Sequence, residues 1–288
     1  MKIVVTGGSG YFGSVIMPVL IREDHSTTIL DMKPPKTINK NIQFIKSNII
    51  KRLPQEFENH DIVIHLASLS RKMSEQNPDL SKKINFETTK KVAEKANEVG
   101  MKFMFASTCS VYENSKGVCD ENTVVNPYSN YARDKLKAEN ILKEFENLDV
   151  KILRFATMYG RSPNMRFDLL INKLIKDATT GKIIIPKLAE DVLPFIHVKD
   201  AARAVSKLLK CGKNGVFNIG SNSQNFKMSY LAEILRQEFE DVVVSFAENP
   251  RDKRNYTVSF NKLEESGIST KYSIKDAISE FKTMYFKK

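Results

Sequence analysis

Short apolar runs alternate with longer amphipathic segments through the first half of the chain. The apolar runs predict strands over residues 2–5, 27–30, 42–46, 61–65, 102–106 and 150–154. Segments whose apolar residues recur every three or four positions predict helices over residues 11–21, 80–99 and 131–146. This alternation is typical of a doubly wound α/β fold, in which helices cover both faces of a parallel sheet.

The alternation becomes less regular after a loop-rich stretch at residues 161–164. At about 150 residues per domain, a chain of 288 residues has room for two domains. We expect a larger domain over residues 1–160 and a smaller α/β domain over residues 161–288, with an active site in the cleft between them. The segment around residues 192–220 is a candidate for return to the first domain.

The composition, with 41% hydrophobic and 27% charged residues, is that of an ordinary globular protein. No apolar run approaches the roughly 18–20 residues that span a bilayer, and this excludes a transmembrane protein. The first residues lack the apolar core of a secretory signal, so we expect a cytoplasmic protein. The three cysteines show no C-x-x-C pairing, which favours reduced thiols over a disulfide framework or a zinc ribbon.

The net charge of +11 favours anionic partners, since 45 Lys and Arg face 34 Asp and Glu. The positive residues are scattered, however, and aromatic residues are not interleaved with them as stacking platforms for bases would be. We therefore interpret the excess as a solvated surface and expect neither nucleic acid nor membrane as a partner. Nucleic-acid binding is kept as the weaker alternative, which a steep loss of affinity with salt would reveal.

A glycine motif follows the first predicted strand and opens the first predicted helix. Its glycines are Gly8, Gly10 and Gly13, and Asp31 follows about 20 positions later. This spacing is typical of dinucleotide binding, because the glycines allow a tight turn and close approach of a pyrophosphate to the helix N-terminus. A carboxylate at Asp31 favours NAD over NADP, although Lys33 nearby could hold a 2′-phosphate.

A second group of residues suggests redox chemistry on an alcohol. Tyr131 and Lys135 are four residues apart on a predicted helix, so they share one face. A phenol is a poor base at neutral pH, but a nearby cation and an oxidised nicotinamide both favour its ionised form. Thr108 follows the fifth predicted strand, at the sheet edge where ligands of open α/β folds bind.

Together these motifs resemble the extended short-chain dehydrogenase/reductase family, and within it the NAD-dependent nucleotide-sugar epimerase/dehydratase group, which includes UDP-glucose 4-epimerase. The resemblance covers nearly the whole chain. The shared motifs are T-G-G-S-G-Y-F-G at 6–13, H-L-A at 65–67, Asn85 with Thr88, S-T at 107–108 with V-Y at 111–112, Pro127, Y-x-x-x-K-x-x-x-E at 131–139, L-R at 153–154, Y-G at 159–160, P-F-I-H-V-K-D at 194–200, F-N-I-G at 217–220 and R-N-Y at 254–256.

The resemblance implies a role for each matching residue. Tyr131 would be the catalytic base, Lys135 would bind the nicotinamide ribose and lower the pKa of the phenol, and Thr108 would bind the sugar hydroxyl. The implied cofactor-binding residues are Gly7, Gly10, Tyr11, Phe12, Asp31, Asn48, Ile49, Leu66, Ala67 and Lys135. The implied substrate-binding residues are Thr108, Tyr131, Thr157 and Arg254, with Arg254 at the diphosphate. Residues 1–160 would form the NAD-binding Rossmann domain, and helices 80–99 and 131–146 a homodimer interface.

Departures from the group's pattern narrow the reaction. Dehydratases follow the catalytic threonine with an Asp-Glu pair, whereas Cys109 and Ser110 stand here, so a 4,6-dehydratase is disfavoured. Cys109 is interpreted as a small buried filler or, alternatively, as a second acid. Glu113 replaces a glycine, Thr157 an asparagine and Leu193 an arginine, which leaves the identity of the nucleotide open.

The function expected from these observations is NAD-dependent epimerisation of a nucleotide sugar at C4 through a transient 4-keto intermediate. The alternatives are an NAD(P)H-dependent keto-sugar reductase, a nucleotide-sugar dehydratase, and a catalytically silent NAD-binding sensor. His65 and His197 show no metal-ligand spacing, so we interpret both as structural and expect no metal.

Overall fold

The central element of the protein is a seven-stranded sheet in the order β11-β7-β5-β4-β1-β2-β3, in which every neighbouring pair is parallel. The computed structural model describes residues 1–37, 40–248, 250 and 252–285. The strands of this sheet are β1 (Lys2–Thr6), β2 (Ser26–Asp31), β3 (Ile42–Lys46), β4 (Ile62–His65), β5 (Lys102–Thr108), β7 (Val150–Phe155) and β11 (Gly215–Ile219). All residues of β4 and β7 are buried, as expected for parallel strands covered on both faces.

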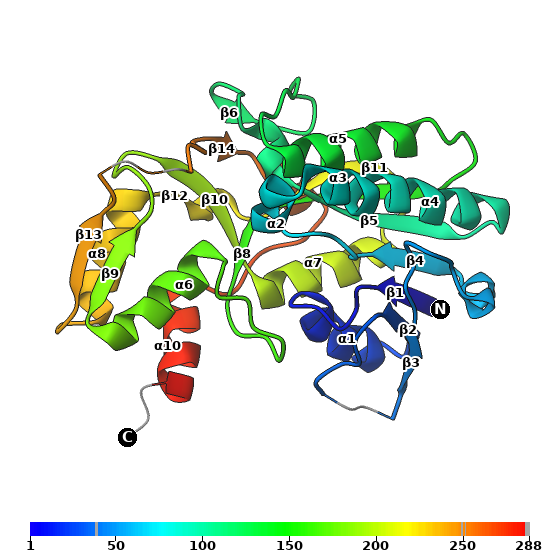
Figure 1. Ribbon diagram of the computed structural model, residues 1–288, viewed down its shortest axis with the longest axis horizontal. Helices are drawn as coiled ribbons and strands as arrows, with labels where there is room; N and C mark the ends of the chain where they lie inside the picture. Colours follow the sequence, from blue (N-terminus) through cyan, green and yellow to red (C-terminus); the bar gives the residue numbers. More distant parts are fainter. Residues whose placement is uncertain (38–39, 249, 251, 286–288) are drawn as a thin grey trace.

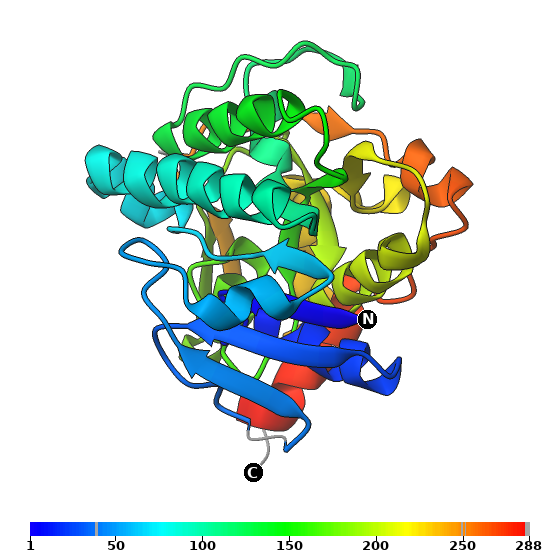
Figure 2. The ribbon, with the colours of Figure 1, turned by 90° about the vertical axis from the view of Figure 1, so that its right-hand side faces the viewer.

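Helices cover both faces of the sheet (Figures 1 and 2). One face carries α1 (Gly13–Arg22) and α7 (Val198–Lys210), and the other carries α4 (Thr88–Glu98) and α5 (Asn130–Lys143). The strand order reverses between β1 and β4. At such a reversal the loops beyond the strands diverge and leave a crevice for ligands. The structure therefore confirms the doubly wound α/β fold that the sequence predicts.

A second, smaller lobe lies beside the carboxyl ends of the central strands (Figure 1). The short sheets of the chain are β12-β10-β8, β13-β9 and β14-β6. Their strands are β6 (Val118–Cys119), β8 (Thr157–Tyr159), β9 (Lys182–Ile185), β10 (Val192–His197), β12 (Asn225–Lys227), β13 (Val243–Phe246) and β14 (Thr257–Val258). The remaining helices are α2 (Arg71–Gln76), α3 (Pro78–Ser81), α6 (Leu170–Asp177), α8 (Met228–Glu238), α9 (Asn261–Glu265) and α10 (Ile274–Tyr285). None of the described helices is long and apolar enough to cross a bilayer.

The chain crosses between the two lobes more than once. β8 pairs with β10 in a short sheet, after which α7 packs against α1 and β11 joins the central sheet beside β7. The apolar core follows the same path, because the buried cluster around Ile16 of α1 and Val205 of α7 continues to Phe195 and Phe281 in the smaller lobe. One apolar cluster therefore continues through both lobes, while a second cluster lies under α4 and α5 in the larger one.

The main differences from the sequence-based elements lie at helix starts. The first helix begins at Gly13 rather than residue 11, because the glycine loop occupies the preceding residues. The helix predicted over residues 80–99 is interrupted by a π-helical segment, Lys82–Glu87. Its wider turn buries Asn85, whose side-chain oxygen accepts hydrogen bonds from the hydroxyl of Ser68 and the N–H of Leu69, at 2.9 and 2.8 Å. The π-helical segment thus anchors the loop after β4.

Candidate active site

A cavity of about 510 Å³ opens at the carboxyl ends of β1, β4 and β5. Its walls bring together every residue that the sequence analysis assigns to a cofactor or a substrate. These residues are Gly7, Gly10, Tyr11, Phe12, Asp31, Asn48, Ile49, Leu66, Ala67, Thr108, Tyr131, Lys135, Thr157 and Arg254. Residues from both lobes therefore meet at one site, although they are spread over some 250 positions of the chain.

The glycine loop at one end of the cavity has no room for side chains. Gly7 has a φ of +71°, and a Cβ atom there would lie 2.7 Å from the backbone nitrogen of Ala67. A Cβ atom on Gly13 would lie 2.4 Å from the carbonyl oxygen of Gly8, so this glycine allows α1 to start directly against the loop. The result is a backbone cradle at a helix N-terminus, which suits a pyrophosphate.

The glycine loop is tied to the loop that follows β8. The hydroxyl of Tyr11 donates to the carbonyl of Gly160 at 2.7 Å, and the hydroxyl of Ser162 donates to the carbonyl of Tyr11 at 2.7 Å. Asn164 adds a side-chain hydrogen bond to the carbonyl of Ser9 at 2.9 Å. The loop-rich stretch at which the sequence pattern changes therefore braces the cradle.

Asp31 ends β2 with its carboxylate fixed at the far end of the cavity. One carboxylate oxygen accepts the backbone N–H of Ser9 at 3.1 Å, and the other accepts that of Lys33 at 3.2 Å. Asn48 and Ile49 line the same end. This geometry places an acceptor where an adenosine ribose would extend from the glycine cradle.

Tyr131 and Lys135 lie in the first turns of α5. Ser129 caps this helix by accepting the N–H of Ala132 at 3.2 Å. The side chain of Lys135 is buried, and its Nζ atom donates to the carbonyl of Ala106 at 2.9 Å. Burial lowers the pKa of Lys135 to about 7, although the charge of Glu139 opposes this shift.

Burial raises the pKa of the Tyr131 phenol above its ordinary value. The charges of Arg166 and Arg71 oppose this shift, as do side-chain hydrogen bonds with Thr108 and Ser68. From the sequence we expect Lys135 to favour the phenolate, but in the structure the cations that favour it are these two arginines. Neither arginine has a sequence signal, because both lie in segments without a periodic pattern.

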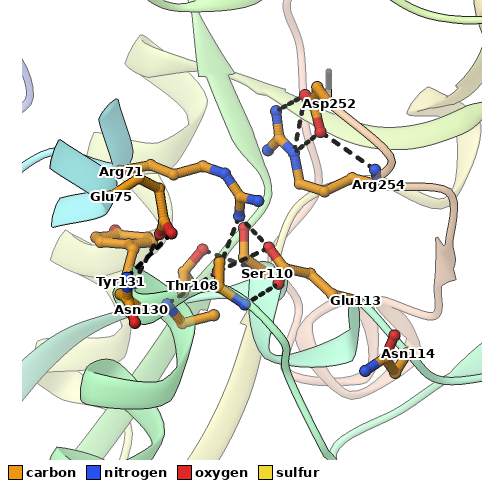
Figure 3. A network of polar contacts seen from close by, with 12 residues as sticks. Arg71, Glu75, Thr108, Ser110, Glu113, Asn114, Asn130, Tyr131, Asp252 and Arg254 are labelled. Carbon is orange, nitrogen blue, oxygen red and sulfur yellow. Dashed lines mark hydrogen bonds and ion pairs between the residues drawn. The ribbon is translucent and has the colours of Figure 1, made fainter. Parts of the chain in front are cut away.

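Arg254 reaches the opposite end of the cavity in a network of alternating charges (Figure 3). Its Nε atom lies 2.9 Å and its Nη2 atom 2.6 Å from the carboxylate of Asp252. Lys187, which is fully buried, donates to the carbonyl of Asp252 at 2.8 Å and to that of Arg254. Burial would raise the pKa of Asp252, but Arg254 and Lys187 together hold it well below its ordinary value. Lys187 is a support that the sequence analysis missed.

Cys109, His65 and His197 are all buried. The thiol of Cys109 donates to the carbonyl of Arg154 at 3.1 Å, and burial raises its pKa well above the ordinary value. This favours the filler interpretation over a second acid. His65 lies between the hydroxyls of Thr6 and Thr89 at 2.7 and 3.1 Å, and burial lowers its pKa to about 3. Among the described residues no group of three His, Cys, Asp or Glu side chains is placed to hold a metal ion.

Comparisons with known proteins show the family and the fold that this chain resembles. A family model described as NAD dependent epimerase/dehydratase matches residues 3–220. A putative UDP-glucose 4-epimerase of Methanocaldococcus jannaschii is 27% identical over 296 residues, which cover 96% of this chain and 95% of that protein. The structure of UDP-glucose 4-epimerase from Thermotoga maritima with UDP-glucose has a TM-score of 0.88, 26% identity and 99% coverage of both chains. That of UDP-N-acetylglucosamine 4-epimerase from Methanobrevibacter ruminantium with UDP-N-acetylmuramic acid has a TM-score of 0.86, 26% identity and 98% coverage of both.

Proposed function

Because the chain belongs to the NAD dependent epimerase/dehydratase family, we propose that it uses NAD to invert C4 of a nucleotide sugar. The observation that carries the proposal is the grouping of Thr108, Tyr131 and Lys135 on the wall of a cavity that also contains the glycine cradle. The named relatives of this chain include UDP-glucose and UDP-N-acetylglucosamine 4-epimerases, so we propose a UDP-sugar as the substrate.

The residues of the cavity fit NAD. The glycine cradle and the start of α1 would hold the pyrophosphate, Asp31 the adenosine ribose, and Asn48 with Ile49 the adenine. Leu66 and Ala67 would flank the dinucleotide, with Tyr11 and Phe12 at the start of the helix and Lys135 at the nicotinamide ribose. Bound NAD would supply a reversible acceptor for the hydride on C4 of the sugar.

The chain itself supplies the proton chemistry. The phenolate of Tyr131 takes the proton of the C4 hydroxyl while the hydride leaves C4, and Thr108 donates a hydrogen bond to the oxygen that becomes a carbonyl. The product of this half-reaction is a 4-keto sugar. When the keto sugar turns its opposite face toward the cofactor, Tyr131 returns the proton to the oxygen as the hydride returns to C4. The product is the 4-epimer, and no external reductant is consumed.

The lining of the cavity favours epimerisation over elimination of water. Of the described residues that line the cavity, Asp31 is the one carboxylate, and it lies at the adenosine end. Elimination of a hydroxyl requires an acid and a base beside the sugar. Ser110 lines the cavity there, whereas Cys109 is buried behind it. A dehydratase would therefore lack its second catalytic group.

The diphosphate end of the substrate would lie at Arg254, whose guanidinium suits phosphate oxygens. Thr157, on β8, would contact the sugar or its nucleotide. We also propose that residues 1–160 mainly bind the cofactor and residues 161–288 mainly the substrate, with α7 and β11 assigned to the first part. A homodimer through α4 and α5 completes the proposal.

The experiment that tests this function is proton NMR with mass spectrometry on the NAD-loaded protein, incubated with a panel of UDP-, GDP-, dTDP- and CDP-sugars. We expect a C4 epimer of unchanged mass from at least one UDP-sugar. Loss of water would instead indicate a dehydratase, and oxidation of added NADH by keto-sugars a reductase. No turnover under any of these conditions would support the silent NAD-binding sensor.

Asp31→Ala should weaken NAD binding by about 10- to 100-fold, the effect of losing a hydrogen bond to a charged group worth ~1.5–3 kcal/mol. NADP affinity should not fall with it, because removal of the carboxylate also removes repulsion of a 2′-phosphate. Calorimetric titration with both cofactors measures the change in preference.

Asp61→Ala is the matched control for Asp31→Ala, because Asp61 also accepts a backbone N–H, that of Lys2 at 2.8 Å, but does not line the cavity. It should leave both affinities unchanged. Equal NAD affinity of the Asp31→Ala and wild-type proteins would contradict the assignment of Asp31 to the ribose.

A further inference from the structure

Glu113 forms an ion pair with Arg71 close to the proposed catalytic tyrosine (Figure 3). Its side chain is fully buried, and its carboxylate contacts the Nη1 atom of Arg71. The same carboxylate accepts the backbone N–H and the hydroxyl of Ser129, each at 3.1 Å. A buried carboxylate needs such partners, because an unpaired buried charge strongly destabilises the folded state. The pair therefore has a defined geometry.

The pair joins three segments of the chain at the start of α5. Arg71 is the first residue of α2, Glu113 follows β5 and its 3-10 turn, and Ser129 caps α5. Arg71 also donates to the Ser129 hydroxyl at 3.0 Å, and its guanidinium lies 5.7 Å from the ring centre of Tyr128. Because Tyr131 comes two residues after the cap, the position of its backbone depends on the same contacts.

Arg71 also lines the cavity with Tyr131, whereas Glu113 does not. The arginine thus presents its charge to the site from one side and is held by the carboxylate from the other. Figure 3 shows Arg71 extending from α2 across the site toward Glu113. Burial raises the pKa of the Tyr131 phenol, and the charge of Arg71 is one of the two that oppose this shift.

Other titratable groups surround the tyrosine and the ion pair. They are Lys72 and Glu75 of α2, Lys135 of α5, Tyr11 before α1, Arg166 and Asp168 before α6, Tyr128 before α5, and Asp252, Arg254 and Tyr256 before β14. Two cations in this group, Arg166 and Arg254, have carboxylate partners of their own in Asp168 and Asp252. Each variant of Arg71 or Glu113 therefore changes one charge while these neighbouring groups stay the same.

We propose that Arg71, held by Glu113, is a positioning residue that presents a positive charge to the Tyr131 hydroxyl and sets the pH range in which Tyr131 acts as a base. The proposal rests on the proposed function, since it assigns the base to Tyr131. It gives Glu113, which stands where the resembling group has a glycine, a specific purpose. The carboxylate fixes the guanidinium and also offsets part of its charge.

Removal of either member of the pair should move the proton affinity of Tyr131 in opposite directions. Arg71→Met removes a positive charge, so the phenolate loses stabilisation and the midpoint of its titration should rise by about one unit. Glu113→Gln keeps one oxygen that can accept from Arg71 and from the Ser129 hydroxyl, but it removes the negative charge and turns an amide NH2 group toward the backbone N–H of Ser129. The arginine then acts without compensation, and the midpoint should fall. A merely structural role would impair both variants in the same way.

The experiment is a spectroscopic pH titration of the NAD-loaded protein, in which tyrosinate absorbance is recorded as the difference between each variant and the same variant with Tyr131→Phe. This difference isolates Tyr131 and needs no substrate. The pH dependence of kcat with UDP-glucose, or with whichever sugar of the panel is turned over, provides the second readout. Arg71→Lys, which keeps the charge, should restore most of the wild-type midpoint.

Arg133→Met is the matched control, because Arg133 is an exposed arginine on the first turn of α5 that does not line the cavity. It should leave the midpoint unchanged. Shifts of the same sign in Arg71→Met and Glu113→Gln, or no shift in either, would overturn the proposal. If Arg71→Met does not fold, Glu113→Gln and Arg71→Lys decide the sign. Opposite shifts without sugar turnover would instead contradict the proposed function and leave the charge effect established.

Discussion

Tyr131→Phe should lower kcat for epimerisation by about 10²–10⁴-fold, the range that a positioned general acid–base contributes. The variant keeps the ring and its packing but removes the group that takes and returns the sugar proton. Thr108 cannot replace Tyr131 as the base, because an aliphatic hydroxyl ionises at a far higher pH than a phenol. NAD affinity should stay within a few-fold of wild type. Initial rates with the substrate identified by NMR, together with calorimetric titration of NAD, measure both quantities.

Tyr128→Phe is the matched control for this variant. Tyr128 lies three residues earlier, is partly exposed and does not line the cavity. Loss of its hydroxyl should leave kcat nearly unchanged. Full activity of Tyr131→Phe would contradict the proposed mechanism, whereas inactivity of both the wild type and the variant on every sugar would favour the silent sensor.

The parts of the site that the sequence predicts are those encoded by local spacing. Gly8, Gly10 and Gly13 form one spaced glycine motif, and Asp31 ends the next strand, so a short stretch of sequence predicts the cofactor end. Tyr131 and Lys135 are four residues apart, and the helical period alone places them on one face. All of these residues except Gly8 line the cavity.

The parts that the sequence does not predict depend on contacts between distant segments. Arg71 meets Glu113 across 42 positions, and Lys187 meets Arg254 across 67. Neither pair has a periodic pattern or a fixed spacing, and the charge of each residue alone suggests an exposed position. Glu113 alone carried a signal, since it replaces a glycine in the pattern that the chain resembles. That replacement indicates a difference from the pattern, but it does not reveal that Arg71 is the partner of Glu113.

The sequence does not predict the hydrogen bond that Lys135 makes either. Spacing places its ammonium near the phenol, but the structure joins it to the carbonyl of Ala106 at 2.9 Å. Burial lowers the pKa of Lys135 to about 7, which weakens it as a permanent cation at neutral pH. The positive charge that acts on Tyr131 therefore comes from Arg71 at the start of α2 and from Arg166 before α6, and the sequence pattern of α5 cannot reveal it.

Arg154→Met should destabilise the protein by about 3–5 kcal/mol, because it removes the ion-pair partner of a buried carboxylate, Glu139. Glu139 is fully buried, and the Nε and Nη2 atoms of Arg154 lie 3.0 and 2.6 Å from its carboxylate oxygens. Ser107, next to Thr108, also donates to this carboxylate. The free energy of unfolding from urea titration measures the loss.

The double variant Arg154→Met/Glu139→Met should recover much of that stability, because replacing both members of a buried pair by apolar groups is often neutral or favourable. Its activity should still fall, since Ser107 loses a partner at the floor of the site and Lys135 loses the charge that raises its pKa. The single variant Glu139→Met completes the comparison. A loss of stability in the double variant equal to the sum of the losses in Arg154→Met and Glu139→Met would contradict this expectation. Additive losses would mean that the two side chains stabilise the fold separately, with no interaction energy between their charges.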